Sequence, residues 1–227
     1  MKQLLLNKIE NREIVVGVIG LGYVGLPLAV EKAKAGFKTI GFDEQEVKVK
    51  MVNEGHNYIG DVVDKDLKRL VEEGRLSATS DFSFIKDVDF IAICVPTPLD
   101  IHQEPDLSCV RESTKSISKY LTKNTMVVLE STTYPGTTEE LVKPILEEGS
   151  GLKCGEDFYL GFSPERVDPG NLIYKTKNTP KVIGGVGKDA TEVIAAMYRT
   201  VLEGDVKELL QRWRRFWRIP TGILTSV

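Results

Sequence analysis

A buried strand that runs directly into a glycine-rich turn is the feature that most restricts the fold of this chain. Residues 13–25 read EIVVGVIGLGYVG. The apolar run over residues 13–20 predicts a strand covered on both faces. A helical pattern over residues 23–35 follows and ends at Gly36. The turn between them carries glycines at GxGxxG spacing, which is informative only between a strand and a helix.

Each glycine of this turn has a physical reason in a dinucleotide-binding site. Gly20 permits the tight turn, Gly22 lets the backbone approach a pyrophosphate, and Gly25 allows the helix to pack closely on the strand. The start of the helix offers N–H groups and a positive dipole end to the phosphates. Glycines that serve only the turn itself are the alternative interpretation.

Asp43 supplies the second part of the predicted site. It ends the next expected strand, residues 38–43, and stands 18 residues after Gly25. A carboxylate at this place accepts hydrogen bonds from the hydroxyls of adenosine ribose. The 2′-phosphate of NADP would meet like charge there, so Asp43 favours NAD. Lys48 is the nearest base, and a solvated aspartate at a strand end is the alternative.

Strands and helices alternate along the chain to about residue 202. Such alternation predicts βαβ units with right-handed crossovers. The expected fold is a single α/β domain, a doubly wound Rossmann-like parallel sheet. Thr137 and Glu140 have the spacing of a capping box for one helix. The other expected strands are 76–79, 88–95, 125–130, 158–162 and 181–184, and the other expected helices are 44–53, 64–73, 106–121, 137–148 and 189–202.

Three further motifs follow expected strands: CVPTP at 94–98, ESTTYPG at 130–136 and SPERVDPG at 163–170. Parallel strands would place all of them on the rim of the sheet where ligands bind. Thr97 would present a hydroxyl and an N–H to the cofactor, and hydroxyls of the second motif would orient a nicotinamide or a water. A carboxylate beside an arginine in the third motif suits an anionic sugar nucleotide. Cys94 is interpreted as a core residue rather than a nucleophile.

Composition excludes several other classes of protein. The chain has 227 residues, of which 41% are hydrophobic, and this apolar content favours a packed core over disorder. Its net charge of −3 does not indicate a protein that binds nucleic acid or a membrane surface. No apolar run approaches the ~18 residues of a membrane span, and the N-terminus is too polar for a secretory signal. The three cysteines form no CxxC pair, so no disulfide or metal site is expected. A soluble cytoplasmic protein is therefore expected.

The C-terminal segment differs from the rest of the chain. Residues 211–218, QRWRRFWR, hold both tryptophans and four arginines. One interpretation is an exposed basic amphipathic helix for a partner or a membrane surface.

Taken together, GLGYVGLPLA, VPTPLD, EPDLS, LESTTYPGTTEE and SPERVDPG resemble the UDP-glucose/GDP-mannose dehydrogenase family over roughly residues 13–206. Within that family the chain is most similar to the enzymes that act on UDP-N-acetylhexosamines. The resemblance implies an NAD-dependent oxidation of the sugar C6 hydroxyl to a carboxylate, for surface polysaccharide biosynthesis. It also implies a UDP-sugar substrate and possible homo-oligomers, with neither nucleic acid nor membrane as a partner.

The resemblance assigns roles to single residues. Asp43 would hold the ribose with Lys48 beside it, and Thr97 and Thr132 would contact the cofactor. Glu165, together with Thr132, would be catalytic, with Glu165 assisting proton movement and thioester hydrolysis. Pro169 stands where UDP-glucose dehydrogenases have a second glutamate, which favours the N-acetylhexosamine branch. The pyrophosphate would be lined by Leu21, Gly22, Tyr23 and Val24, and the substrate would contact Glu165, Arg166 and Val167.

The resemblance also defines the expected domains. Residues 1–206 would be the NAD-binding domain, while the family's central helix and second domain, which carry the nucleophilic cysteine, have no counterpart in the sequence. Turnover by this chain alone is therefore expected to be weak or absent. Residues 207–227 would be an atypical tail, interpreted as a frameshift product. The alternatives are a small β-hydroxyacid-type dehydrogenase and a non-catalytic dinucleotide-binding module that recruits a partner through the tail.

Overall fold

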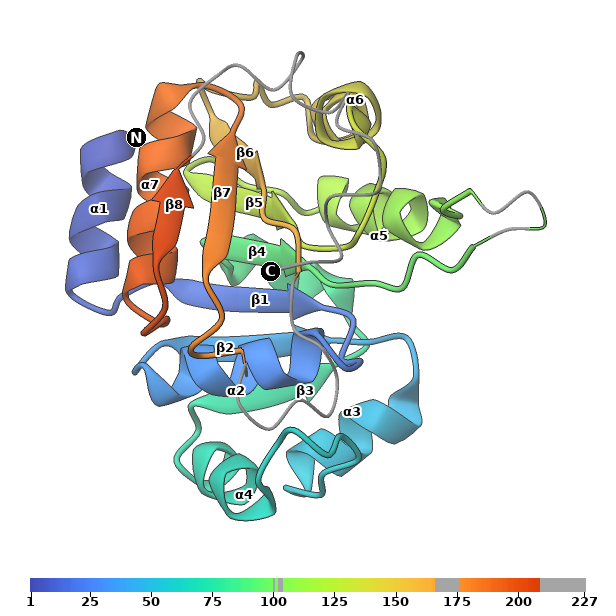
Figure 1. Cartoon of the computed structure of the whole chain (residues 1–227), viewed down its shortest axis with the longest axis vertical. Coiled ribbons are helices and arrows are strands. Elements are labelled where there is room, and N and C mark those ends of the chain that lie inside the picture. The colour runs from blue at the N-terminus through green and yellow to red at the C-terminus, as the bar shows by residue number, and fades with distance from the viewer. Residues whose placement is uncertain (100, 102–103, 166–175, 209–227) are drawn as a thin grey trace.

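The computed structural model describes residues 1–99, 101, 104–165 and 176–208. Its centre is an eight-stranded sheet of order β3-β2-β1-β4-β5-β6-β7-β8 (Figure 1). Strands β1 to β6 are parallel to one another, β7 runs antiparallel to β6, and β8 runs parallel to β7. The strands are β1 (Val15–Ile19), β2 (Lys38–Phe42), β3 (Leu76–Thr79), β4 (Phe90–Ile93), β5 (Thr125–Leu129), β6 (Phe158–Phe162), β7 (Lys181–Gly185) and β8 (Val206–Glu208).

The predicted doubly wound α/β fold is confirmed, because the first six strands have the Rossmann order 3-2-1-4-5-6. The expectation of an all-parallel sheet is wrong for its last two strands. A parallel neighbour needs a long crossover, usually a helix, whereas an antiparallel neighbour does not. The described residues between β6 and β7, 163–165 and 176–180, contain no such helix.

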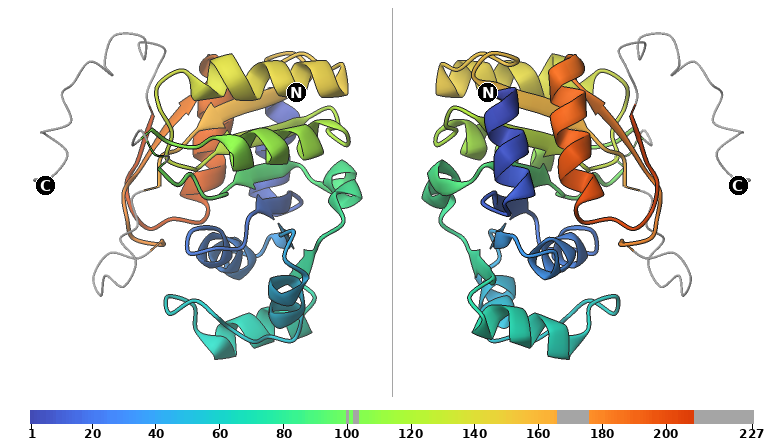
Figure 2. Two further views of the ribbon diagram at one scale, coloured as in Figure 1. Left: turned by 90° about the vertical axis from the view of Figure 1, so that its right-hand side faces the viewer. Right: turned by 90° about the vertical axis from the view of Figure 1, so that its left-hand side faces the viewer.

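Helices cover both faces of the sheet (Figures 1 and 2). One core cluster joins the strands to α1, α2, α4 and α7, and the other joins them to α5 and α6. In β5, Met126 and Val128 belong to the first cluster while Val127 and Leu129 belong to the second, so the apolar strand is buried on both sides as predicted. The helices are α1 (Lys2–Glu10), α2 (Gly25–Lys34), α3 (Glu46–Asn53), α4 (Asp64–Glu72), α5 (Ser108–Ser118), α6 (Lys143–Ser150) and α7 (Lys188–Arg199), with a 3₁₀-helix η1 (Phe82–Asp87) and a π-helix η2 (Thr137–Val142).

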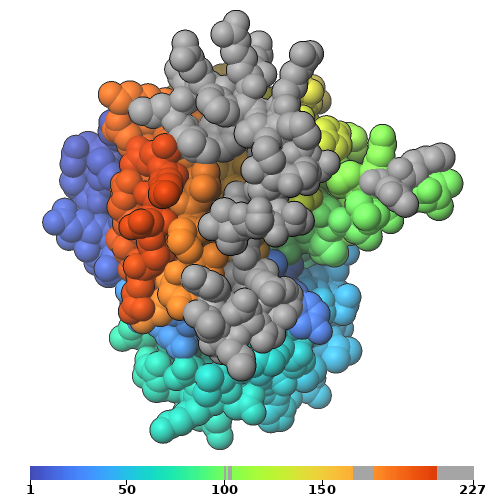
Figure 3. Space-filling model, viewed as in Figure 1, coloured from blue at the N-terminus to red at the C-terminus, as the bar shows by residue number. Residues whose placement is uncertain are grey.

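The helix α1 was not predicted. It packs beside α7, and Figure 3 shows α1 in blue next to the orange and red of α7 and β8. Leu5 and Ile9 are the buried residues of α1, and Lys2 forms an ion pair with Asp189 at 3.0 Å. Two buried side chains in nine residues are too few for a clear amphipathic pattern.

The predicted capping box of Thr137 and Glu140 is wrong. The residue before η2 is Gly136, in the left-handed conformation at φ +94°. Thr137 therefore already lies inside the helix, and its hydroxyl donates to the Tyr134 carbonyl at 2.8 Å. The expected helix 137–148 begins as η2 and continues as α6.

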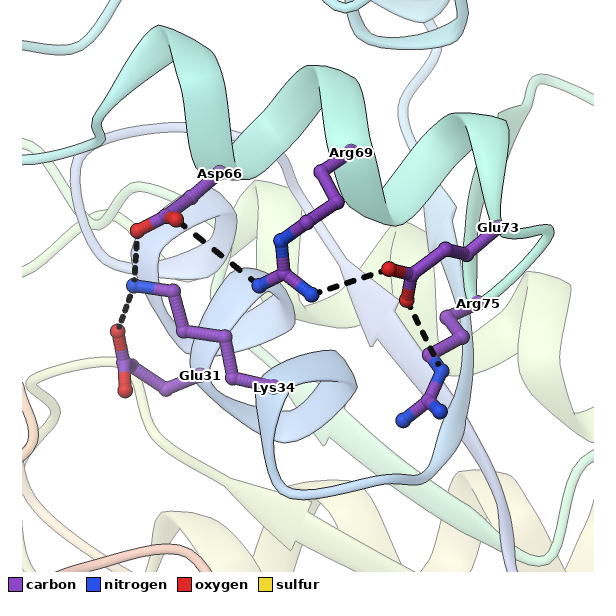
Figure 4. Close-up of polar contacts among 6 residues, drawn as sticks. All are labelled: Glu31, Lys34, Asp66, Arg69, Glu73 and Arg75. Carbon is purple, nitrogen blue, oxygen red and sulfur yellow. Dashed lines mark hydrogen bonds and ion pairs between the residues drawn. The ribbon is translucent and has the colours of Figure 1, made fainter.

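A chain of ion pairs joins α2 to α4 and to the start of β3 (Figure 4). Lys34 on α2 lies 2.8 Å from Asp66 on α4, and its hydrogen bond lowers the pKa of that carboxyl. Exposed pairs of this kind contribute roughly 0–1 kcal/mol each, so burial of Leu67 and Leu70 is the stronger attachment of α4. The chain consists of Glu31, Lys34, Asp66, Arg69, Glu73 and Arg75.

Candidate functional site

The motifs that the sequence singled out follow β1, β2, β4, β5 and β6. These strands are parallel, so all five motifs begin at one edge of the sheet, as predicted. This is the edge at which doubly wound sheets bind ligands.

Two of the three glycines in the turn after β1 are required because a side chain there would clash with the protein's own backbone. Gly20 has φ +88°, donates its N–H to the Phe42 carbonyl at 2.7 Å, and would bring a Cβ within 3.0 Å of the Cys94 carbonyl oxygen. A Cβ at Gly25 would stand 1.8 Å from the Gly20 carbonyl oxygen. These two glycines therefore have the packing reasons that the sequence predicts.

Gly22 is different, because a Cβ there would meet no described atom within 4 Å. The missing side chain leaves space that the fold itself does not use, and this fits the close approach of a pyrophosphate. Among the other predicted pyrophosphate residues, Leu21 is fully buried against Gly41, and its N–H and carbonyl are bonded to Asp43 and Tyr58. Tyr23 is 63% exposed.

The Asp43 carboxylate lies beside the same turn and is 8% exposed. One oxygen accepts the Leu21 N–H at 2.8 Å and lies 3.3 Å from the Lys48 ammonium. The other oxygen accepts the Gln45 N–H at 2.9 Å. A carboxylate accepts about four hydrogen bonds, so a grip on both ribose hydroxyls requires Lys48, the most distant partner, to give up its contact.

Thr97 and Thr132 are brought together from neighbouring loops. The Thr97 hydroxyl donates to the Thr132 carbonyl at 2.7 Å, and the Ser131 hydroxyl donates to the Val95 carbonyl at 2.6 Å. These bonds join the loop after β4 to the loop after β5. The Thr132 side chain is exposed and that of Thr97 is half-buried.

A buried charged cluster lies behind these loops, and the sequence did not reveal it. Lys181, at the start of β7, donates to the Glu130 carboxylate and, at 3.1 Å, to the Glu165 carboxylate. The Tyr198 hydroxyl on α7 also donates to Glu130. The side chains of Lys181 and Glu130 are 1% and 0% exposed. We refer to Glu130, Glu165, Lys181 and Tyr198 as the buried cluster.

The electrostatics of the buried cluster favour an ion pair. Burial alone lowers the pKa of Lys181, but the Glu130 and Glu165 carboxylates outweigh it and raise that pKa above its ordinary value. Burial raises the pKa of Glu130, while the Lys181 charge opposes the shift. Burial, and then the Glu130 charge, raise the pKa of Tyr198 well above its ordinary value. Lys181 therefore stays cationic and Tyr198 stays protonated as donors to Glu130.

Glu165, the predicted catalytic carboxylate, belongs to this cluster. Its side chain is 8% exposed, so it faces Lys181 more than solvent. Two sequence signals could have indicated the cluster. Glu130 and Lys181 are charged residues at the ends of the strongly apolar segments TMVVLE and KVIGG.

Lys32 on α2 lies close to the buried cluster. Its side chain is fully buried, and its ammonium has no hydrogen-bond partner among the described residues. It lies 4.1 Å and 4.2 Å from the ring centroids of Phe90 and Tyr198. Burial lowers the pKa of Lys32 to about 7, with the Glu130 charge opposing this shift.

Cys94 and Cys154 carry no sign of an activated nucleophile. Burial raises the pKa of Cys94 well above its ordinary value and that of Cys154 to about 11. A protonated thiol is a poor nucleophile. Cys94 lies in the core, as predicted.

The predicted substrate residues Arg166 and Val167, and the basic segment 211–218, lie outside the described residues. A pocket of about 670 Å³ is lined by residues 133–140, Phe162 and residues 184–186. None of the predicted cofactor residues lines it, so it is distinct from the glycine turn.

Within residues 1–99, 101, 104–165 and 176–208, every helix is too short or too polar to cross a membrane. No group of three or more His, Cys, Asp or Glu side chains in these ranges is arranged to hold a metal ion.

Comparison with known proteins gives consistent matches. Residues 14–202 match the profile of the UDP-glucose/GDP-mannose dehydrogenase family, NAD binding domain. The chain is 40% identical over 196 residues to Protein CapL of Staphylococcus aureus, covering 86% of this chain and 45% of that protein. It is 38% identical over 191 residues to UDP-N-acetyl-D-glucosamine 6-dehydrogenase of Pseudomonas aeruginosa, covering 84% and 44%.

A solved structure agrees with these matches. NDP-N-acetyl-D-galactosaminuronic acid dehydrogenase from Methanosarcina mazei Go1 has a TM-score of 0.81 and 35% identity, over 89% of this chain and 46% of that chain. The chain thus spans about half the length of the relatives that it matches.

Proposed function

The chain belongs to the UDP-glucose/GDP-mannose dehydrogenase family, and from this premise we propose that it binds NAD at the turn between β1 and α2. The observation that carries the proposal is the open space at Gly22, beside the Asp43 carboxylate. The turn and the first N–H groups of α2 would hold the pyrophosphate. Asp43 would hold the adenosine ribose, with Lys48 beside it.

We further propose that this NAD-binding domain, residues 1–206, serves the oxidation of the C6 hydroxyl of a UDP-N-acetylhexosamine in surface polysaccharide biosynthesis. NAD would supply the hydride acceptor. The names of two relatives, which refer to N-acetylated sugar nucleotides, support this substrate class. Thr97 and Thr132 would bind the cofactor near the reacting carbon. Glu165, held by Lys181, would move a proton, a role that contributes roughly 10²–10⁴-fold where it operates.

A matched pair of glycine substitutions tests the cofactor site. Gly22→Ala is expected to leave the melting temperature nearly unchanged, because its Cβ meets no described atom within 4 Å. Its NADH affinity is expected to fall by about tenfold or more, equivalent to ~1.4 kcal/mol, because the methyl group occupies the space of the pyrophosphate. Gly25→Ala should lower both the melting temperature and the NADH affinity, since its Cβ would stand 1.8 Å from the Gly20 carbonyl oxygen. Calorimetry and NADH fluorescence titration measure the two quantities. Unchanged affinity in a stable Gly22→Ala would contradict the proposal.

A further inference from the structure

Tyr58 contacts the glycine turn, although it belongs neither to the GxGxxG motif nor to the strand end that carries Asp43. Its hydroxyl donates a hydrogen bond to the Leu21 carbonyl at 2.7 Å. The Leu21 carbonyl and the Gly22 N–H belong to one planar peptide unit. A partner that fixes the carbonyl therefore also fixes the direction of the Gly22 N–H.

The preceding peptide is fixed from the other side. Asp43 accepts the Leu21 N–H at 2.8 Å, which sets the plane of the peptide between Gly20 and Leu21. The Leu21 side chain is fully buried against Gly41. The described contacts thus hold Leu21 at its N–H, its carbonyl and its side chain. Because the Leu21–Gly22 peptide is trans, its N–H points away from the Tyr58 hydroxyl.

The loop between α3 and α4 holds Tyr58 firmly. The Asn57 amide donates to the carbonyls of Ile59 and Val62, both at 2.6 Å, and accepts the Ile59 N–H at 2.7 Å. The Tyr58 ring packs half-buried against the core. Burial, and then the Asp43 charge, raise the pKa of Tyr58 above its ordinary value, so the hydroxyl remains a donor across the physiological range.

We propose that Tyr58 is a positioning residue of the dinucleotide site, which orients the Leu21–Gly22 peptide so that its N–H faces the diphosphate. The inference rests on the proposed NAD site. The proposal makes the loop between α3 and α4 part of the binding site, although the GxGxxG motif and Asp43 lie only on β1, α2 and the end of β2. An oriented N–H requires no rearrangement when the anion arrives, which is the physical advantage of preorganisation.

The test is Tyr58→Phe in the full chain, which keeps the ring and removes the hydroxyl. NADH and ADP-ribose affinities are expected to fall about three- to tenfold, the range expected for one lost hydrogen bond. Adenosine contains no phosphate, so its affinity, followed by NMR titration, is expected to stay within twofold of wild type. Tyr120→Phe, whose tyrosine follows α5 and is 39% exposed, is the matched control and should leave all three affinities unchanged.

The ratio of ADP-ribose to adenosine affinity separates positioning from mere loosening of the domain. A selective loss of ADP-ribose affinity supports the proposal. Unchanged affinities, or an equal loss for ADP-ribose and adenosine, overturn the role of Tyr58 and leave the NAD site standing. If wild type binds neither NADH nor ADP-ribose, the proposed function fails, and the role of Tyr58 fails with it.

Discussion

Replacement of Lys181 by methionine is expected to lower the free energy of unfolding by about 3–5 kcal/mol, the usual loss when a buried ion pair is deprived of one partner. The Glu130 carboxylate is fully buried and would lose its cation. Tyr198 would remain as a donor to Glu130, but one neutral donor does not balance a buried charge. Urea unfolding at pH 7 measures the loss.

Lys177→Met is the control for this prediction. Lys177 pairs with Glu203 at 2.6 Å, but its side chain is 50% exposed. Its removal is expected to leave the free energy of unfolding nearly unchanged, because exposed ion pairs contribute little. The double variant Lys181→Met/Glu130→Gln should recover part of the loss, because the fully buried Glu130 side chain no longer carries an uncompensated charge. A loss in Lys181→Met no larger than in the control would contradict the account of the buried cluster.

The pH dependence of the stability loss in Lys181→Met distinguishes an unpaired buried charge on Glu130 from a simple packing defect. Without Lys181 the folded-state pKa of Glu130 should rise further, because burial still raises it and the opposing cation is gone. A carboxyl whose pKa is raised in the folded state makes the protein less stable as the pH rises from the pKa of the unfolded state to that of the folded state. The deficit of Lys181→Met should therefore be smaller at pH 5 than at pH 8, whereas a packing defect would give the same deficit at both.

Replacement of Lys32 by methionine is expected to have the opposite sign and to raise the free energy of unfolding by up to about 4 kcal/mol at pH 7, because burial lowers the pKa of Lys32 from 10.5 to about 7 and each pKa unit corresponds to ~1.4 kcal/mol. Lys32 is fully buried and has no hydrogen-bond partner among the residues described. Methionine retains the length of the side chain and its contacts with the rings of Phe90 and Tyr198. Lys34→Met, two residues along α2 and 30% exposed at its side chain, is the control and should be neutral or slightly destabilising.

The stability gained in Lys32→Met should depend on pH in a defined direction. Burial lowers the pKa of Lys32 from 10.5 to about 7 in the folded state. Between these values the unfolded chain binds more protons, so wild-type stability rises with pH through this interval. The gap between variant and wild type should therefore narrow from pH 7 to pH 10. If this difference in the free energy of unfolding stays constant or widens, the buried charge of Lys32 does not destabilise the fold.

Most of the sheet was predictable because its strands are continuous apolar runs that end at turn residues. The expected boundaries of β3 and β6 agree with the structure. The helix α1 and the strand β8 were missed for physical reasons. α1 buries only Leu5 and Ile9, and β8 is a three-residue segment, VKE, that becomes a strand by pairing with β7.

The cofactor turn was predictable because its glycines stand at GxGxxG spacing between an apolar strand and a helical pattern. The buried cluster was missed, because charged residues at strand ends do not show which of them meet, and that depends on the direction of β7. In a parallel sheet the first residue of β7 would lie at the amino edge, far from the site. The antiparallel β7 instead brings Lys181 to the carboxyl edge, within 3.1 Å of Glu165. Tyr58 was missed because its partner is a backbone carbonyl, which leaves no signature in the sequence.

Titration of the full chain with NADH and with NADPH tests the central claim most directly, because it probes the glycine turn and Asp43 together. The account predicts saturable NADH binding that is at least about tenfold tighter than NADPH binding, equivalent to ~1.4 kcal/mol, since a 2′-phosphate would meet the Asp43 carboxylate. Asp43→Asn should reduce this preference. Absence of saturable NADH binding, or equal affinity for the two dinucleotides, would contradict it.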